Sequence, residues 1–410
     1  MPVSNPLEAV APIRPRPRLA ALRRTWPLAI ALLVIAVVWS GLAFSKYGRP
    51  AYTSALVLPD MMVELPVRPA TWFTPTPIVD RTYIDYGSGR ILADIYRPPD
   101  GERHAAMIFS MGAPPLGLED SRLVKLAEAV ARGGLVMVVP SSPRLHAELI
   151  KLEEIDALVG IFEYLEEQPY VDPERIGYMG VSVGGSLALV AAADPRVAER
   201  VKYVVAFGAA YNAVDTLVAV GSRTVTYNGQ EEDWEPRKHA IEVMALQLIV
   251  ELSSRDDKRT LCKAFVDPWD RDLCGAGAGR EAVSDFEIAR LTPEGRAVYD
   301  LMTSGDPVVA RELLEKLPAG AVERLERLSP SRTIDRLQSE VFIIHDRGDE
   351  FIPYFESRRL RDALAGRGDV HFTEVSLFEH VRPRLTDGDV IVLDTVRLYF
   401  RLYQLLLTLS

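Results

Sequence analysis

Ser182 lies in the sequence Gly-Val-Ser-Val-Gly-Gly, between a short apolar run at 176–179 and a stretch of small residues at 186–193. A serine hydroxyl is a poor nucleophile unless it is exposed and placed beside a base. A sharp turn from a strand into a helix provides that exposure, and the positive end of the helix stabilises negative charge nearby. The pattern therefore predicts that Ser182 is a nucleophile that attacks acyl carbonyls, rather than an ordinary turn serine.

An acid and then a histidine are expected to follow such a serine in chain order. The β-branched and aromatic run at 341–345 predicts a late strand, which is followed by Asp346 and Asp349. Asp349 lies in the turn beyond the end of this strand, on the side of the sheet where a nucleophile would be. We predict Asp349 as the acid, with Asp346 as the alternative closer to the strand.

The base can be chosen by elimination, because the chain has only six histidines. Five of them lie in polar turns, in strands or in regions remote from both motifs: His104, His146, His239, His345 and His371. His380 follows the predicted strand at 370–375, on a loop before the last helix. It occupies the third position of the ordered set, and we predict it as the general base.

Taken together, these residues resemble the α/β-hydrolase superfamily, in particular its dienelactone-hydrolase-like and prolyl-oligopeptidase-like branches. The segment 172–177 leading into 180–185 is similar to the approach to the nucleophile in those branches, and 349–353 is similar to their acid loop. The resemblance extends from about residue 79 to the C-terminus, without the middle insertion. It implies an α/β-hydrolase fold. Dienelactone hydrolases themselves have a cysteine nucleophile, so their activity is not implied.

The resemblance also implies an oxyanion hole made of two backbone N–H groups. One would come from Val183, and the other from Met111 or Gly112 in the loop after the predicted strand at 105–110. Loss of one such donor costs on the order of 100- to 1000-fold in rate. The chain departs from the family where Met111-Gly112 replaces the usual His-Gly, and where Asp346 replaces a usual glycine. Both departures leave the substrate unspecified.

The elements that must position these residues alternate between strands and helices from 105 to 207, after an antiparallel hairpin at 78–97. This alternation, with continuously apolar strands, predicts an α/β fold with a mostly parallel sheet covered by helices on both faces. Reaction chemistry is expected at the carboxyl ends of such strands. We therefore expect the first part of the hydrolase core at 78–210 and the second part at 333–410.

Between 211 and 332 the alternation stops, and helices joined by loops are expected, including 238–253, 281–291 and 308–317. An insertion at this point predicts a helical cap that excludes water and shapes the substrate pocket. The apolar segment 390–409 is interrupted by charged residues, which favours a final helix packed on the sheet. The alternative is a helix that lies on a membrane surface.

The N-terminal region differs in composition from the rest. Residues 1–25 contain five arginines and one glutamate, and 26–44 contain no charged residue. As a helix, 26–44 would be about 28 Å long, close to the roughly 30 Å of a bilayer's hydrocarbon core. We expect a basic cytoplasmic tail at 1–25, a transmembrane helix at 26–44 and an extracytoplasmic catalytic domain. A cleaved signal peptide is the alternative.

Residues 45–77 contain six prolines and are expected to form a tether without regular helix. Cys262 and Cys274 lie in the middle insertion, where a disulfide is plausible outside the cytoplasm. No histidine is spaced with them as a metal site requires, so no metal or other cofactor is expected. The net charge of −10 argues against a nucleic-acid partner.

The function predicted from these features is a membrane-anchored serine hydrolase that acts on carboxylic esters of small or lipid-like molecules. A peptidase or acyltransferase could use the same three residues. A catalytically silent hydrolase fold, serving as a binding or scaffold protein at the membrane, is the alternative from a different class. The oligomeric state does not follow from the sequence.

Overall fold

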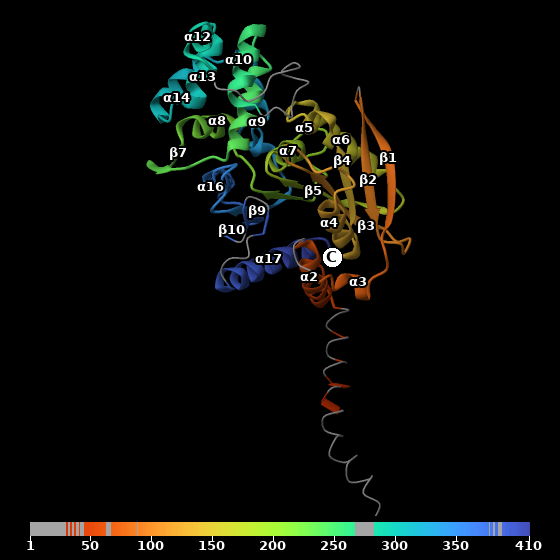
Figure 1. The fold of residues 1–410 in the computed structure, drawn as a ribbon. Helices are drawn as coiled ribbons and strands as arrows, with labels where there is room; N and C mark the ends of the chain where they lie inside the picture. Colours follow the sequence, from red (N-terminus) through yellow and green to blue (C-terminus); the bar gives the residue numbers. More distant parts are fainter. Residues whose placement is uncertain are drawn as a thin grey trace, which may run out of the picture.

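The computed structural model describes residues 45–62, 67–87, 89–266, 283–376, 378–379, 382–383 and 388–410, with isolated positions between 30 and 41. An eight-stranded sheet in the order β1-β2-β4-β3-β5-β6-β9-β10 forms its centre (Figure 1). The strands are β1 (Ile78–Tyr86), β2 (Gly89–Arg97), β3 (His104–Ser110), β4 (Val136–Ser141), β5 (Val171–Val181), β6 (Tyr203–Phe207), β9 (Glu340–Asp346) and β10 (Val370–Val375). β2 is antiparallel to both of its neighbours, and the other pairs are parallel. This sheet confirms the predicted fold class and fits the α/β-hydrolase fold.

Helices cover both faces of the sheet. Successive side chains of each strand point to opposite faces, and in the central strands most of those on both faces are apolar and buried beneath helices. The helices around the sheet are α2 (Gly48–Met61), α4 (Ser121–Arg132), α5 (Pro143–His146), α6 (Glu153–Glu166), α7 (Val183–Ala192), α16 (Phe355–Ala363) and α17 (Gly388–Thr408). On β3, Ala106 and Ile108 join the core beneath α6 and α7, whereas Met107 and Phe109 join the core beneath α2, α4 and α17. The predicted final helix therefore packs on the sheet.

The expectation that prolines exclude regular helix from 45–77 is wrong, because this region contains α2 (Gly48–Met61) and α3 (Ala70–Phe73). Pro50 lies in the first turn of α2, where backbone N–H groups make no hydrogen bond within the helix, so proline costs none there. Pro59 lies in the last turn. The helix buries Val57 and Leu58, and it packs against α4 and α17. Tertiary packing thus outweighs the low helix propensity of proline.

The insertion at 211–332, called the cap below, is mainly helical and has its own apolar core. Its elements are α8 (Ala213–Ser222), β7 (Thr224–Tyr227), β8 (Gln230–Asp233), α9 (Lys238–Ile249), α10 (Arg255–Phe265), α12 (Asp285–Ala289), α13 (Pro293–Thr303), α14 (Pro307–Leu313), η1 (Leu314–Lys316), α15 (Ala319–Arg327) and η2 (Pro330–Arg332), with η3 (Ile334–Arg336) just beyond it. The hairpin β7–β8 is a difference from the expected helices and loops. Cys262 in α10 is disulfide-bonded, and Cys274 lies outside the described residues.

The cap and the helices α2, α3 and α17 lie at opposite ends of the molecule (Figure 1). In the part of the chain that the structure describes, no helix is both long and apolar enough to cross a membrane. The tail at 1–25 lies outside the described residues, and so does the predicted transmembrane segment at 26–44 apart from its isolated positions.

Candidate active site

Ser182 lies in the predicted sharp turn between β5 and α7, with backbone angles φ of 58° and ψ of −131°. Its N–H donates a 2.8 Å hydrogen bond to the carbonyl oxygen of Phe207, and its own carbonyl accepts one of 2.8 Å from the N–H of Gly185. A non-glycine residue in such a conformation costs about 1–3 kcal/mol, and it persists only where the surrounding structure imposes it. The half-buried Ser182 is therefore presented at the start of a helix, as the nucleophile prediction requires.

Two of the neighbouring glycines are required by close packing. A Cβ on Gly184 would lie 2.1 Å from the carbonyl oxygen of Ser110, at the end of β3. A Cβ on Gly180 would lie 2.1 Å from the carbonyl oxygen of Gly184 itself. Any side chain at these positions would force α7 away from the sheet and displace Ser182. The glycines thus set the position of the turn as well as permitting it.

The predicted oxyanion segment lies directly against Ser182. A Cβ on Gly112 would be 3.1 Å from the Cβ of Ser182 and 3.5 Å from its Oγ. Met111 is buried. Val183 is the first residue of α7, and the first N–H groups of a helix have no acceptor within it. The structure therefore brings Ser182, Val183 and the Met111-Gly112 segment together, and the choice of the second donor stays a prediction.

Backbone hydrogen bonds align the ends of β5, β6 and β9. Ser182 bonds to Phe207 at the end of β6, and the N–H of Gly208 donates to the carbonyl oxygen of Ile344 in β9 at 2.8 Å. β9 ends two residues later, and Asp349 lies in the turn that follows. The predicted nucleophile and the predicted acid thus belong to the same carboxyl edge of the sheet.

Asp349 is 2% exposed, and its carboxylate organises the turn around it. Its Oδ1 accepts hydrogen bonds from the N–H groups of Phe351 at 2.8 Å and Ile352 at 3.0 Å. Its Oδ2 lies 3.4 Å from Nε2 of His345, which is also 3.0 Å from the carbonyl oxygen of Ile352. His345 is fully buried, so it positions the acid loop and is not available as the base. The sequence showed His345 only as the end of a strand.

Of the two remaining predicted residues, the structure describes Asp346 but not His380. Asp346, the alternative acid, is the last residue of β9, and its Oδ1 accepts a 2.7 Å hydrogen bond from the N–H of Gly348. It is buried like Asp349, so burial does not distinguish the two acids. His380 lies outside the described residues, and its role as the base stays a prediction.

Two cap residues that sequence reasoning did not identify contact the acid loop. The indole N–H of Trp234 donates a 2.8 Å hydrogen bond to the carbonyl oxygen of Asp349. The backbone N–H of Arg237 donates to the carbonyl oxygen of Glu350 at 2.8 Å, and its guanidinium pairs with the Glu350 carboxylate at 2.6 Å. Both residues follow the unpredicted hairpin β7–β8. The cap is therefore tied directly to the loop that carries the predicted acid.

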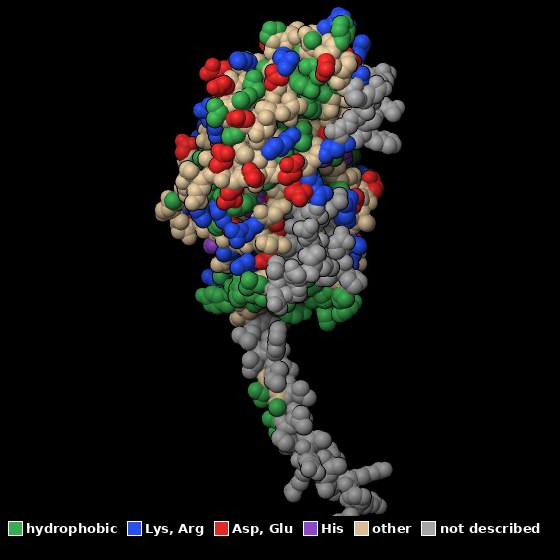
Figure 2. Space-filling model, turned by 60° about the vertical axis from the view of Figure 1, so that its left-hand side comes forward, with side chains coloured by type: hydrophobic (Ala, Val, Ile, Leu, Met, Phe, Trp, Pro, Cys, Tyr) green, Lys and Arg blue, Asp and Glu red, His purple; other side chains and the backbone are tan. Residues whose placement is uncertain are grey.

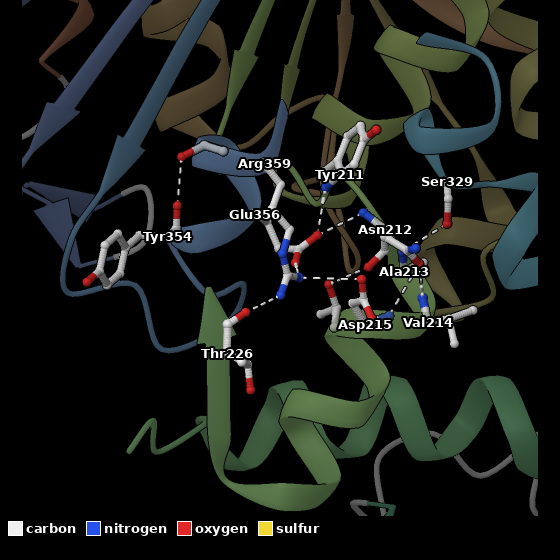
Figure 3. Close-up of polar contacts among 12 residues, drawn as sticks. Tyr211, Asn212, Ala213, Val214, Asp215, Thr226, Ser329, Tyr354, Glu356 and Arg359 are labelled. Carbon is white, nitrogen blue, oxygen red and sulfur yellow. Dashed lines mark hydrogen bonds and ion pairs between the residues drawn. The ribbon is translucent and has the colours of Figure 1, made fainter. Parts of the chain in front are cut away.

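Glu356, on α16, links the acid loop to the start of the cap (Figure 3). Its Oε2 accepts hydrogen bonds from the N–H groups of Tyr211 at 3.0 Å and Asn212 at 2.8 Å. Its other carboxylate oxygen accepts from Arg359, which also lies 3.5 Å from Asp215. Burial raises the pKa of Glu356 above the ordinary value of 4.5, although Arg359 and the backbone N–H of Asn212 oppose the shift.

The first and last residues of the cap meet beside this carboxylate. The N–H of Ala213 donates to Oγ of Ser329 at 2.9 Å (Figure 3). The N–H of Ser331 donates to the carbonyl oxygen of Tyr211 at 3.0 Å. Glu356 lies only a few residues after Asp349 in the chain. The cap junction and the acid loop therefore form one connected unit.

Within the described ranges, no group of three or more His, Cys, Asp or Glu residues is arranged to hold a metal ion.

Comparison with known families gives a match over the segment that contains the nucleophile turn. Residues 146–242 match the prolyl oligopeptidase family. The matched segment is a minor part of the chain, and a comparison with curated proteins finds no match. The family match supports a serine hydrolase of the prolyl-oligopeptidase-like type, and it does not distinguish ester from peptide substrates.

A comparison with solved structures also gives matches at low sequence identity. The acylaminoacyl peptidase of Pyrococcus horikoshii is 14% identical with a TM-score of 0.44, and the alignment covers 82% of this chain and 42% of that one. The hyperthermophilic esterase of Pyrobaculum calidifontis is 16% identical with a TM-score of 0.44, over 92% of this chain and 98% of that one. A puromycin hydrolase is 15% identical with a TM-score of 0.47, over 83% and 40%. This chain thus spans less than half the length of the acylaminoacyl peptidase and the puromycin hydrolase.

Proposed function

We propose that this chain is a serine hydrolase that cleaves carboxylic esters through Ser182, His380 and Asp349. The Oγ of Ser182 attacks the acyl carbonyl while His380 removes its proton. Asp349 orients the imidazole and stabilises its positive charge. His380 then donates the proton to the departing alkoxide, which leaves an acyl-enzyme.

The same groups then hydrolyse the acyl-enzyme, with water as the attacking nucleophile. His380 removes a proton from water, the resulting hydroxide attacks the acyl carbon, and the Ser182 oxygen leaves with the proton from His380. In both steps the negative oxygen is stabilised by the N–H of Val183 and by a second N–H from Met111 or Gly112.

The observation that carries this proposal is the strained backbone of Ser182 beside Gly112. A serine that serves only as a turn residue has no need of a conformation that costs about 1–3 kcal/mol. The position of Asp349 in a buried turn at the same sheet edge supports the assignment of the acid. The family match over the nucleophile turn supports the class of reaction.

Labelling of the full chain with a fluorophosphonate probe tests the proposal. Ser182→Ala and His380→Ala should abolish labelling. Asp349→Asn should reduce it by a factor on the order of 10⁴, as loss of the orienting carboxylate does in serine proteases. Asparagine is preferred to alanine here, because its side-chain oxygen can still accept from the N–H groups of Phe351 and Ile352.

Asp346→Asn is the matched control for the acid, since Asp346 is also buried and also accepts a backbone N–H. Unchanged labelling in Asp346→Asn, with strongly reduced labelling in Asp349→Asn, supports Asp349. The opposite result would transfer the role to Asp346. A folded wild-type chain that never reacts would overturn the enzyme proposal and favour the catalytically silent binding protein.

Peptide cleavage is the second candidate, because the family that matches 146–242 is named for an oligopeptidase. A matched pair of substrates, the p-nitrophenyl ester and the p-nitroanilide of one acyl group, separates the two activities. An esterase should hydrolyse the ester and leave the anilide intact. Enzymatic turnover of the anilide that is lost in Ser182→Ala would favour the peptidase.

We also place the enzyme at a membrane, with residues 1–25 in the cytoplasm and the catalytic domain outside. The support is the uncharged segment 26–44 that follows five arginines. Full-length protein that resists alkaline extraction, and whose catalytic domain is cleaved by protease added outside intact cells, is the expected result. Recovery of a chain that begins after residue 44 would indicate a cleaved signal peptide instead.

A further inference from the structure

Exposed apolar side chains gather at the end of the molecule opposite the cap. This surface, called the basal face, consists of Trp72 and Phe73 on α3 and Val392, Leu393, Val396 and Phe400 on α17. Figure 2 shows hydrophobic side chains concentrated at this lower end, where Figure 1 places α2, α3 and α17. Single exposed apolar residues are ordinary, but a concentration of them indicates an interaction surface.

The exposure is large on both helices. Trp72 is 68% exposed, Phe73 67% and Val392 65%. On α17 the positions 392, 396 and 400 recur at the helical spacing, so they form one outward stripe. The opposite side of the same helix already packs in the protein core, where Leu398 and Leu405 are buried. The outward stripe is therefore not explained by the fold of the chain.

The short covalent link between segment 26–44 and α2 limits what can cover the basal face. Only residues 45–47 separate the uncharged segment 26–44 from the start of α2 at Gly48. Three residues span at most about 10 Å. α2 contacts both α3 and α17, the helices of the basal face. A bilayer that contains 26–44 must therefore lie close to the basal face.

Charge distinguishes a bilayer from a second copy of the chain. Lys46, just before α2, and Arg49, in its first turn, are both exposed. Each cation near a membrane surface with anionic lipids contributes about 1 kcal/mol of attraction. In a symmetric contact between two copies with its axis near the start of α2, the same cations would face each other and repel. Tryptophan is also enriched at the interface between membrane and water, which suits Trp72.

We propose that the basal face docks on the surface of the bilayer that holds residues 26–44. This inference rests on the proposed membrane attachment, and it is independent of the hydrolase activity. Because the attachment makes docking intramolecular, weak contacts are sufficient for it. The cap would then face away from the bilayer, so that substrates reach it from the aqueous side.

The test uses full-length protein in vesicles of phosphatidylcholine and phosphatidylglycerol. A fluorescent NBD group is attached to a single new cysteine in Phe73→Cys or Leu393→Cys, without reductant because Cys262 is disulfide-bonded. Phe286→Cys is the matched control, since Phe286 is 68% exposed on α12 at the cap end. Spin-labelled lipids should quench the probes at 73 and 393 and leave the probe at 286 unchanged.

Flotation with the vesicles reports attachment separately from docking. Protein that floats with unquenched probes at 73 and 393 would overturn docking and leave the anchor intact. Protein that does not float would overturn both. Probes that are shielded from aqueous iodide but not quenched by the lipids, together with crosslinking between copies, would identify a second copy as the occupant. Fluorophosphonate labelling of the same samples reports the hydrolase proposal independently.

Discussion

Gly112 and Ser182 approach each other so closely that a Cβ on the glycine would lie 3.1 Å from the Cβ of the serine and 3.5 Å from its Oγ. The two residues follow adjacent parallel strands, β3 and β5. The predicted oxyanion segment and the predicted nucleophile are therefore held at a fixed separation. We expect the reactivity of Ser182 to be sensitive to small changes in the loop.

Gly112→Ala should slow fluorophosphonate labelling on the order of 10- to 100-fold, less than the loss of a whole donor. The added methyl requires a shift of a few tenths of an ångström, which moves the donor away from the oxyanion. Gly117→Ala is the control on the same loop, because a Cβ there meets no atom within 4 Å. Equal labelling rates in the two variants would contradict the role of the Met111-Gly112 segment in the oxyanion hole.

Ser182→Gly should be more stable than Ser182→Ala by about 1 kcal/mol. Glycine removes a strain of about 1–3 kcal/mol and has an entropic cost of roughly 0.5–1 kcal/mol in return. Both variants lack the hydroxyl, so the comparison isolates the backbone. Urea unfolding of the two proteins measures the difference, and a more stable alanine variant would show that the conformation is not strained.

Trp234→Phe should reduce the labelling rate by up to about tenfold, since the lost hydrogen bond to Asp349 is worth about 0.5–1.5 kcal/mol. The acid loop would be less well positioned while the aromatic packing is retained. Trp72→Phe, at the opposite end of the molecule, should keep the wild-type rate. If Trp234→Phe changes only the melting temperature, the contact stabilises the cap without positioning the acid.

The buried Glu356 predicts a loss of stability as pH rises above about 4.5. Burial raises its pKa in the folded protein above the ordinary value of 4.5, so the folded state binds more protons than the unfolded state between these two pKa values. Stability then decreases with rising pH across that window. Glu356→Gln cannot ionise and should show a smaller decrease in melting temperature.

Glu350→Gln is the control for this pH dependence, because Glu350 lies in the acid loop just before α16 and its side chain is about half exposed. It should retain the wild-type slope. A Glu356→Gln variant with that same slope would show that another group is responsible. The absolute melting temperatures of the two variants are not the readout, since each also changes an ion pair.

Local patterns were sufficient to predict the sheet and the sharp turn that holds Ser182. The glycine spacing around Ser182, the apolar run before it and the small residues after it belong to one short segment, and the turn is confirmed. The strands at 341–345 and 370–375 could be predicted from the sequence for the same reason. The periodicity of a strand or helix is a local property, so a single sequence displays it directly.

Contacts between distant segments were not predictable in this way. The sequence by itself determined the mostly parallel α/β sheet and the sharp turn that holds Ser182. Only the tertiary structure decided that α2 forms despite two prolines, that Trp234 contacts Asp349, and that Glu356 binds the start of the cap. These outcomes depend on which surfaces meet after the chain folds, and the free energy of packing and buried hydrogen bonds then outweighs local propensity.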